Sequence, residues 1–86
     1  MDNPLQRKTV LTRELDDEVV LFQRDTGKSI HLNRTAGIIW LYCDGRHSER
    51  QIYDSLSSLF PAEDAERLHQ ELRATLQRFR DEALLV

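Results

Sequence analysis

The side chains most able to do chemistry in this sequence are its histidines and its single cysteine. His31, His47 and His69 are far apart, and none has a partner ligand at the spacing that a metal site on one helix needs. Cys43 falls on the apolar stripe of an expected helix, where a free cysteine usually behaves as a small hydrophobic residue. The three glycines are scattered singly and form no phosphate-binding loop. We therefore expect a protein that is not an enzyme and binds neither a metal nor a cofactor.

Size and charge limit the class further. Eighty-six residues make one small domain. Twelve Lys and Arg against fifteen Asp and Glu give a net charge of −3, which counts against a nucleic-acid partner. A single cysteine excludes an internal disulfide framework. No apolar run is long enough for a membrane span, and the first four residues do not start a signal peptide, so we expect a cytoplasmic protein without a membrane partner.

The first third of the chain predicts three antiparallel strands. Residues 1–7 carry no period and are expected to be a flexible arm, so the folded domain would span 8–86. Strand signals run from Lys8 to Leu15 and from Val19 to Arg24. A hairpin turn at Asp25-Thr26-Gly27-Lys28, with Gly27 free to take positive φ, leads to a third strand at Ser29–Leu32.

A central helix is predicted after the third strand. Asn33 is a good N-cap, and Asp44-Gly45 is expected to end the helix. The apolar stripe consists of Ala36, Ile39, Trp40 and Cys43. Gly37 costs about 1 kcal/mol relative to Ala inside a helix. It indicates either a close approach of another backbone or a tolerated weak position.

Two further helices are predicted on either side of Pro61. Ser48 and Gln51 form a capping-box pattern at the start of the first of them. Its expected buried stripe is Ile52, Leu56, Leu59 and Phe60, and that of the last helix is Ala65, Leu68, Leu72, Leu76, Phe79 and Ala83. The apolar residues 84–86 are expected to fold back onto the core. The order predicts an α+β fold, with a three-stranded antiparallel sheet followed by three helices.

The last two helices also allow a second interpretation, a helix-turn-helix that binds DNA. Arginines on the last helix would contact phosphates, but acidic residues on the same helix cancel their field. A winged-helix DNA-binding regulator is therefore the alternative function. A structural subunit that stabilises a partner enzyme is a third possibility.

The third strand offers the more informative feature, a free edge. Ser29–Leu32 pairs on one side only, and it has no charge, proline or bulge of the kind that blocks an edge, apart from Lys28 at its start. Such an edge can receive an extended peptide as an additional strand. The C-terminal tail or another molecule could cover the edge instead.

A combination of short segments extends over most of the chain. These segments are Glu18-Val19-Val20-Leu21-Phe22, Thr26-Gly27-Lys28, Leu32-Asn33-Arg34-Thr35-Ala36, Ile39-Trp40, Asp44-Gly45, Ile52 and Ala83-Leu84-Leu85. Together they resemble the PqqD-like proteins, which are peptide chaperones of pyrroloquinoline quinone biosynthesis, and the related leader-recognition domains of other modified-peptide pathways. The resemblance runs from about residue 8 to the end.

This resemblance implies a winged-helix-like fold and binding of the leader of a ribosomally made precursor peptide. Family members present that peptide to a modifying enzyme, often a radical S-adenosylmethionine enzyme. The leader would add to the third strand, Ser29–Leu32, and rest against the last helix between Leu68 and Arg80. Two positions depart from the family pattern: Arg34 replaces a proline or an acidic residue, and Ala83 replaces a glycine. The alanine would let the last helix continue into the tail.

The last helix has two borders beside its buried stripe, and the sequence favours one of them for the peptide. One border carries His69, Arg73 and Arg80, and the other carries Glu71, Thr75, Arg78 and Glu82. Leaders in this family often include acidic residues, so the more basic border is the predicted one, with Leu72 and Leu76 as apolar anchors. The predicted peptide-binding residues are Lys28, Ser29, Ile30, His31, Leu32, His69, Leu72, Arg73, Leu76 and Arg80.

Overall fold

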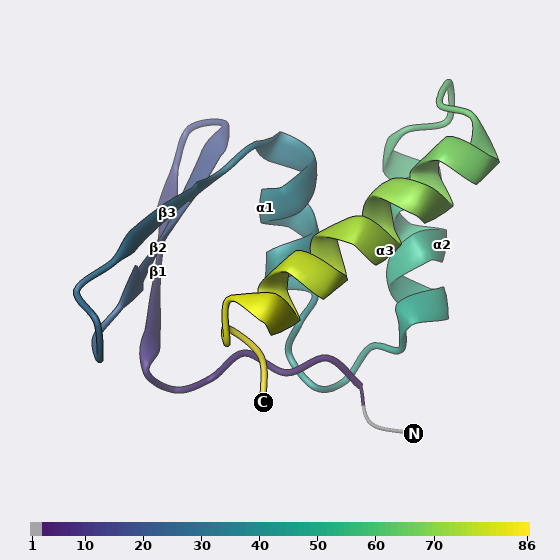
Figure 1. Cartoon of the computed structure of the whole chain (residues 1–86). Coiled ribbons are helices and arrows are strands. Elements are labelled where there is room, and N and C mark those ends of the chain that lie inside the picture. The colour runs from purple at the N-terminus through teal and green to yellow at the C-terminus, as the bar shows by residue number, and fades with distance from the viewer. Residues whose placement is uncertain (1–2) are drawn as a thin grey trace.

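The computed structural model describes residues 3–86, so Met1 and Asp2 of the expected arm lie outside the described residues. The elements in chain order are β1 (Val10–Leu15), β2 (Glu18–Gln23), β3 (Ser29–Leu32), α1 (Arg34–Leu41), α2 (Glu49–Leu59) and α3 (Ala65–Asp81). Figure 1 shows the sheet on one side of the molecule and the helices on the other. The predicted winged-helix-like α+β fold is confirmed.

The sheet has the order β1-β2-β3, and both pairs are antiparallel. Two tight turns join the strands. The first contains Asp16 with φ of 30°, and the second contains Gly27 with φ of 72°. A positive φ costs a glycine little, because it has no Cβ to clash with its own carbonyl. The predicted role of Gly27 in the second turn is confirmed.

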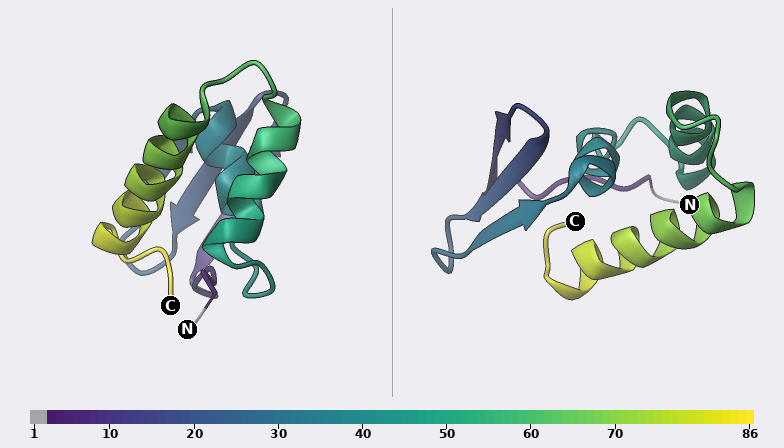
Figure 2. Two further views of the ribbon diagram at one scale, coloured as in Figure 1. Left: turned by 90° about the vertical axis from the view of Figure 1, so that its right-hand side faces the viewer. Right: turned by 90° about the horizontal axis from the view of Figure 1, so that it is seen from above.

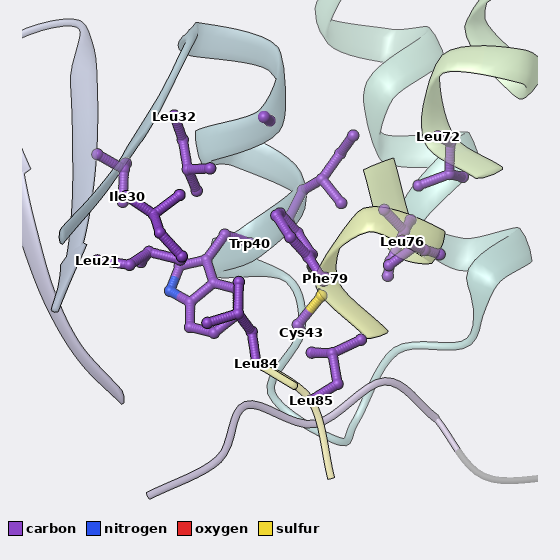
Figure 3. Packing of buried hydrophobic residues seen from close by; sticks show 14 of the residues in the cluster. Leu21, Ile30, Leu32, Trp40, Cys43, Leu72, Leu76, Phe79, Leu84 and Leu85 are labelled. Carbon is purple, nitrogen blue, oxygen red and sulfur yellow. Dashed lines mark hydrogen bonds between the residues drawn. The ribbon is translucent and has the colours of Figure 1, made fainter. Parts of the chain in front are cut away.

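Helix α1 occupies the middle of the molecule, between the sheet and the other two helices (Figure 2). Its Trp40 is fully buried and meets the ring of Phe79 edge to face, with centroids 5.3 Å apart. The Trp40 indole Nε1 donates a hydrogen bond of 2.8 Å to Thr12 Oγ1 on β1. Figure 3 shows Trp40 and Phe79 between the apolar residues of the sheet and those of α3. The core therefore joins both layers through α1, which the sequence predicted as the central helix.

Both predicted N-caps are confirmed. The Asn33 side chain accepts from the backbone N–H of Ala36, and Ser48 and Gln51 form a reciprocal capping box. The stripes are shorter than expected at their ends. Leu59 is 53% exposed, and Ala65 is exposed, because these residues lie in terminal turns beyond the contact between α2 and α3.

Helix α1 ends earlier than the sequence predicted. The helix ends at Leu41, so Cys43 and Gly45 lie in the loop that follows. Gly45 has φ of 80°, and its backbone N–H donates to the carbonyl of Pro4. A Cβ at this position would lie 3.2 Å from the Leu5 side chain. Gly45 therefore serves the contact with the N-terminal segment and not a helix C-cap.

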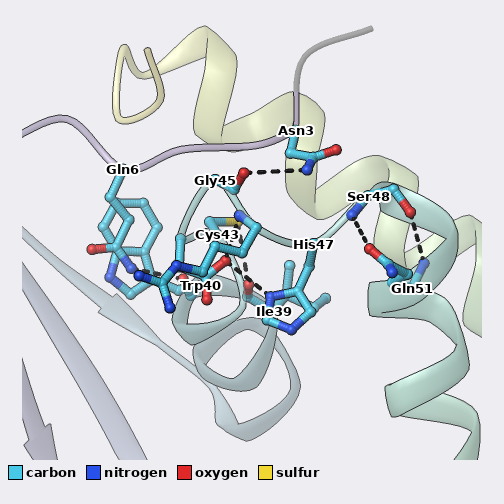
Figure 4. Close-up of polar contacts among 11 residues, drawn as sticks. Asn3, Gln6, Ile39, Trp40, Cys43, Gly45, His47, Ser48 and Gln51 are labelled. Carbon is cyan, nitrogen blue, oxygen red and sulfur yellow. Dashed lines mark hydrogen bonds and ion pairs between the residues drawn. The ribbon is translucent and has the colours of Figure 1, made fainter.

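Residues 3–7 differ from the expected flexible arm, because their backbone is hydrogen-bonded to distant parts of the chain. Gln6 N–H donates to Cys43 O, and Arg7 N–H donates to Leu84 O. The Gln6 side chain adds a bond to Trp40 O, and that of Asn3 adds one to Gly45 O (Figure 4). Main-chain bonds of this kind leave no periodic pattern in the sequence. The packed domain therefore begins before residue 8.

The C-terminal tail folds back as predicted, with Leu84 and Leu85 buried. The expected continuation of α3 into this tail is wrong, however. Ala83 takes φ of 57°, and the helix ends at Asp81 with Glu82 as its cap. A left-handed alanine costs roughly 1–2 kcal/mol. Burial of the two leucines that follow offsets that cost.

Gly37 marks a close approach, although to a side chain and not to a backbone. A Cβ built on Gly37 would lie 2.8 Å from Val19 Cγ2 and 3.2 Å from Val19 Cβ, with the Val19 backbone nitrogen farther away at 3.9 Å. A valine has no flexible end that could yield, so helix and strand would have to separate.

The Gly37→Ala substitution is therefore expected to destabilise the fold. Overpacking costs about 1–3 kcal/mol, whereas the gain in helix propensity returns about 1 kcal/mol. Denaturant titration should show a lower midpoint with an unchanged slope. Gly37→Ala combined with Val19→Ala should lose less stability than the two separate losses added together. A midpoint above that of the wild type for Gly37→Ala alone would contradict the close contact.

Candidate functional site

The backbone pattern of the hairpin fixes which groups of β3 face its open side. Gln23 N–H donates to Lys28 O at 2.9 Å. Bonded and non-bonded pairs alternate in an antiparallel ladder, so with the register Leu21↔Ile30 the backbone of Ile30 is directed at β2. The backbone N–H and C=O groups of Ser29 and His31 are consequently directed away from β2, toward the free edge. The length of the turn and the register of the hairpin are enough to predict which backbone groups of β3 face the free edge. The sequence-based prediction of the site did not make this distinction.

No described strand pairs with that edge of β3. The sheet ends at β3, and the side chains of Ser29 and His31 are exposed. The C-terminal tail, which could have covered the edge, runs elsewhere: Leu85 bridges to Gln6, and Val86 N–H donates to Leu5 O. Within residues 3–86 the edge therefore keeps its backbone donors and acceptors open to a ligand.

Helix α3 lies on the same side of the molecule as β3, and its C-terminal end approaches the β2–β3 hairpin (Figures 1 and 2). A hydrogen bond of 3.0 Å from Gln23 Nε2 to Glu82 O fixes that approach. An extended segment added to β3 would consequently have α3 beside it.

The predicted basic border of α3 faces the wrong way for this site. The His69 ring is stacked on Tyr53 of α2, with centroids 3.7 Å apart and planes 10° apart. Arg73 Nε lies 3.8 Å from a carboxylate oxygen of Glu49 at the start of α2. His69 and Arg73 therefore line the α2 side of α3, and Arg80 shares this border. The sequence could not show this, because both borders flank the apolar stripe equally and only the neighbouring helix distinguishes them.

The predicted anchors Leu72 and Leu76 are also corrected. Both are 0% exposed in the core and offer no surface to a ligand. Ile30 and Leu32 likewise direct their side chains into the core. Of the ten predicted residues, the structure brings Ser29 and His31 to the open edge of β3, whereas Lys28 precedes the strand and its carbonyl accepts from Gln23 of β2.

The border of α3 that faces β3 carries Glu71, Thr75, Arg78 and Glu82. Thr75 is half-buried, whereas Arg78 is held by an ion pair of 3.0 Å to Glu82. At the hairpin end, Lys28 and Glu82 line a hollow of about 380 Å³ together with Asp25 and Asp81. This flank is mixed in charge and is not the basic rim that was expected.

The single cysteine is buried, so its thiol is shielded from solvent. Burial raises the pKa of the Cys43 thiol to about 12, so the reactive thiolate does not form at neutral pH. The backbone N–H of Arg46 and the ring of His47 lower the pKa of the exposed Asp44 carboxyl. The described residues contain no group of three or more side chains that could hold a metal ion. The arrangement can recognise a chain through backbone hydrogen bonds.

No helix within residues 3–86 is both long enough and apolar enough to cross a membrane.

The fold and the open edge together define a winged-helix-like domain with a strand available for pairing. The family model described as Coenzyme PQQ synthesis protein D (PqqD) matches residues 18–85. This chain belongs to the PqqD family. No curated protein matches it in sequence.

Two solved structures have the same fold. One is described as TbiB1 in complex with the TbiA(beta) leader peptide. It is 25% identical with a TM-score of 0.85, and the match covers 94% of this chain and 93% of that one. The other is described as lasso peptide synthetase B1 complexed with the leader peptide, at 18% identity and a TM-score of 0.85, and the match covers 98% of both chains. The second likeness shows the fold alone.

Proposed function

We propose that this chain is a non-enzymatic peptide chaperone that binds the leader of a ribosomally made precursor peptide. The leader adds as a strand to the free edge of β3 and lies beside α3. The observation that carries this proposal is the edge itself, where Ser29 and His31 direct their backbone groups to an uncovered side of the sheet. Membership of the PqqD family and the two leader-bound structures of the same fold support it.

The partners follow from this role. The chain would present its bound peptide to a modifying enzyme, for example a radical S-adenosylmethionine enzyme, and it would do so in the cytoplasm, as expected from the sequence. No observation favours the winged-helix DNA-binding regulator, because α3 mixes acidic and basic side chains and Arg73 and Arg78 already have carboxylate partners.

The position of the peptide beside α3 can be tested on Thr75. The Thr75→Arg substitution places a long cation on the half-buried border that faces β3, and it should weaken leader binding by at least about tenfold, or 1.4 kcal/mol. The measurement is calorimetric titration with a synthetic leader peptide that the wild-type chain binds.

The matched control is Arg73→Glu on the opposite border. It removes an exposed pair with Glu49, and such pairs contribute little, so binding should change less than about threefold. If Arg73→Glu weakens binding while Thr75→Arg does not, the peptide lies on the α2 side of α3. If neither change matters, α3 does not contact the leader.

A further inference from the structure

The outer face of the sheet, which points away from the helices (Figure 2), contains a hollow with exposed apolar side chains. The hollow has a volume of about 510 Å³, and residues of all three strands line it. Leu11 and Phe22 lie opposite each other on β1 and β2 and are 49% and 41% exposed. Phe22 in turn lies opposite Ser29 of β3, which also lines the hollow. One row across the sheet therefore passes from two exposed apolar side chains to a small serine at the free edge.

The neighbouring row on the same face ends differently at the free edge. There His31 of β3 lies opposite Val20 of β2. The Nδ1 atom of His31 is 3.6 Å from a carboxylate oxygen of Glu18, so the imidazole is held over this face of the sheet. A side chain that extends from the free edge toward Val20 would first meet this imidazole. The small Ser29 side chain, in contrast, leaves the path from the edge to Phe22 open.

We propose that this outer hollow binds one large apolar side chain of the leader, at the leader position that pairs with Ser29. Because the leader must first add to β3, this binding rests on the proposed function. Residues directly opposite each other on neighbouring strands point to the same face, so the leader residue opposite Ser29 points outward. Two strand spacings of about 4.8 Å each separate its backbone from that of Phe22, and two large side chains that lean over a serine can span this distance.

Continuity with the proposed peptide site favours the leader as the occupant of the hollow. Ser29 belongs to both surfaces, because its side chain lines the hollow and its backbone N–H and C=O are directed at the free edge. The two outward leader positions beside β3 are therefore unequal: one faces the hollow, and the other, two residues away, faces the His31 imidazole. In strand addition, backbone bonds supply affinity and side-chain pockets supply specificity. The hollow would thus set the register of the leader along β3.

Calorimetric titration with an alanine scan of the leader tests the proposal. The probe is a synthetic leader peptide that the wild-type chain binds, with each residue replaced by alanine in turn. Replacement of one large apolar leader residue should weaken binding to the wild-type chain by at least about tenfold. The same replacement should cost less than about threefold against Phe22→Ser, because this variant has already lost the contact. Phe22 lies outside the buried core, and circular dichroism checks that the variant is folded. The scan against the control Leu59→Ser, which changes an exposed leucine at the end of α2, should match that of the wild type.

The size of the side chain at position 29 provides a second test. Ser29→Trp keeps the backbone N–H and C=O but fills the path to Phe22, so leader binding should weaken by at least about tenfold, whereas Ser29→Ala should stay within about threefold of wild type. If Phe22→Ser relieves no alanine replacement in a leader that the wild-type chain binds, the hollow is left to another molecule. Strand addition then stands, and the proposed role of the hollow is overturned. A folded His31→Pro variant that binds the leader as tightly as wild type would instead reject strand addition and the role of the hollow together.

Discussion

Trp40→Ala is expected to leave the chain largely unfolded. Trp40 is fully buried in α1 and packs edge to face on Phe79 of α3. Its indole also donates to Thr12 on β1, so one side chain joins the two layers of the molecule. Truncating a buried aromatic residue costs about 3–5 kcal/mol, and a domain of this size has only about 5 kcal/mol or slightly more in total. Far-ultraviolet circular dichroism during a thermal scan measures the loss.

Two further variants distinguish the loss of ring packing from the loss of the indole hydrogen bond and from the truncation of an exposed apolar residue. Trp40→Phe retains most of the ring contact but removes the indole N–H, so it should keep a cooperative transition at a lower midpoint temperature. Leu59→Ala truncates an apolar residue that is 53% exposed and should shift the midpoint by only a few degrees. A cooperative transition of Trp40→Ala within a few degrees of wild type would show that Trp40 does not join the layers.

Much of the fold could be predicted because its signals are local. The N-cap at Asn33, the capping box of Ser48 and Gln51, and the positive φ of Gly27 each depend on a few neighbouring residues. Such signals act within one turn of the chain, and the sequence displays them directly. Element order and fold class follow from them.

The errors lie where distant residues decide the outcome. The backbone of residues 3–7 is ordered by bonds to Cys43 and Leu84, and neither bond leaves a pattern in the sequence. Ala83 accepts a left-handed conformation although its own preference opposes it. The sharp turn lets the two leucines that follow it, Leu84 and Leu85, become buried. Their burial stabilises the turn, so tertiary packing overrides the local propensity of alanine here.

The candidate site also has one part that the sequence could predict and one part that it could not. The sequence indicated the free edge of β3, because Ser29–Leu32 contains no residue that would block pairing. It could not indicate which border of α3 meets that edge. The stacking of His69 on Tyr53 and the pair of Arg73 with Glu49 show which border faces α2, because both partners lie on that helix.

His31→Pro is expected to remove leader binding while the hairpin stays folded. The N–H of His31 is directed at the free edge and not at β2, so proline removes a donor that only an added strand would use. Edge strands tolerate proline at such positions. The loss leaves a leader carbonyl without a donor and sets the proline ring in the path of the added strand. Together these effects should weaken binding by about tenfold to a hundredfold.

Two controls give this result its meaning. His31→Ala removes the imidazole and its pair with Glu18 but keeps the N–H, so leader binding should stay within about threefold of wild type. Ile30→Pro removes an N–H that is directed at β2 and should unfold the hairpin, with loss of the strand signal in circular dichroism. A folded His31→Pro variant that binds the leader as tightly as wild type would refute pairing at this edge, because strand addition to β3 uses the His31 donor whatever the leader sequence is.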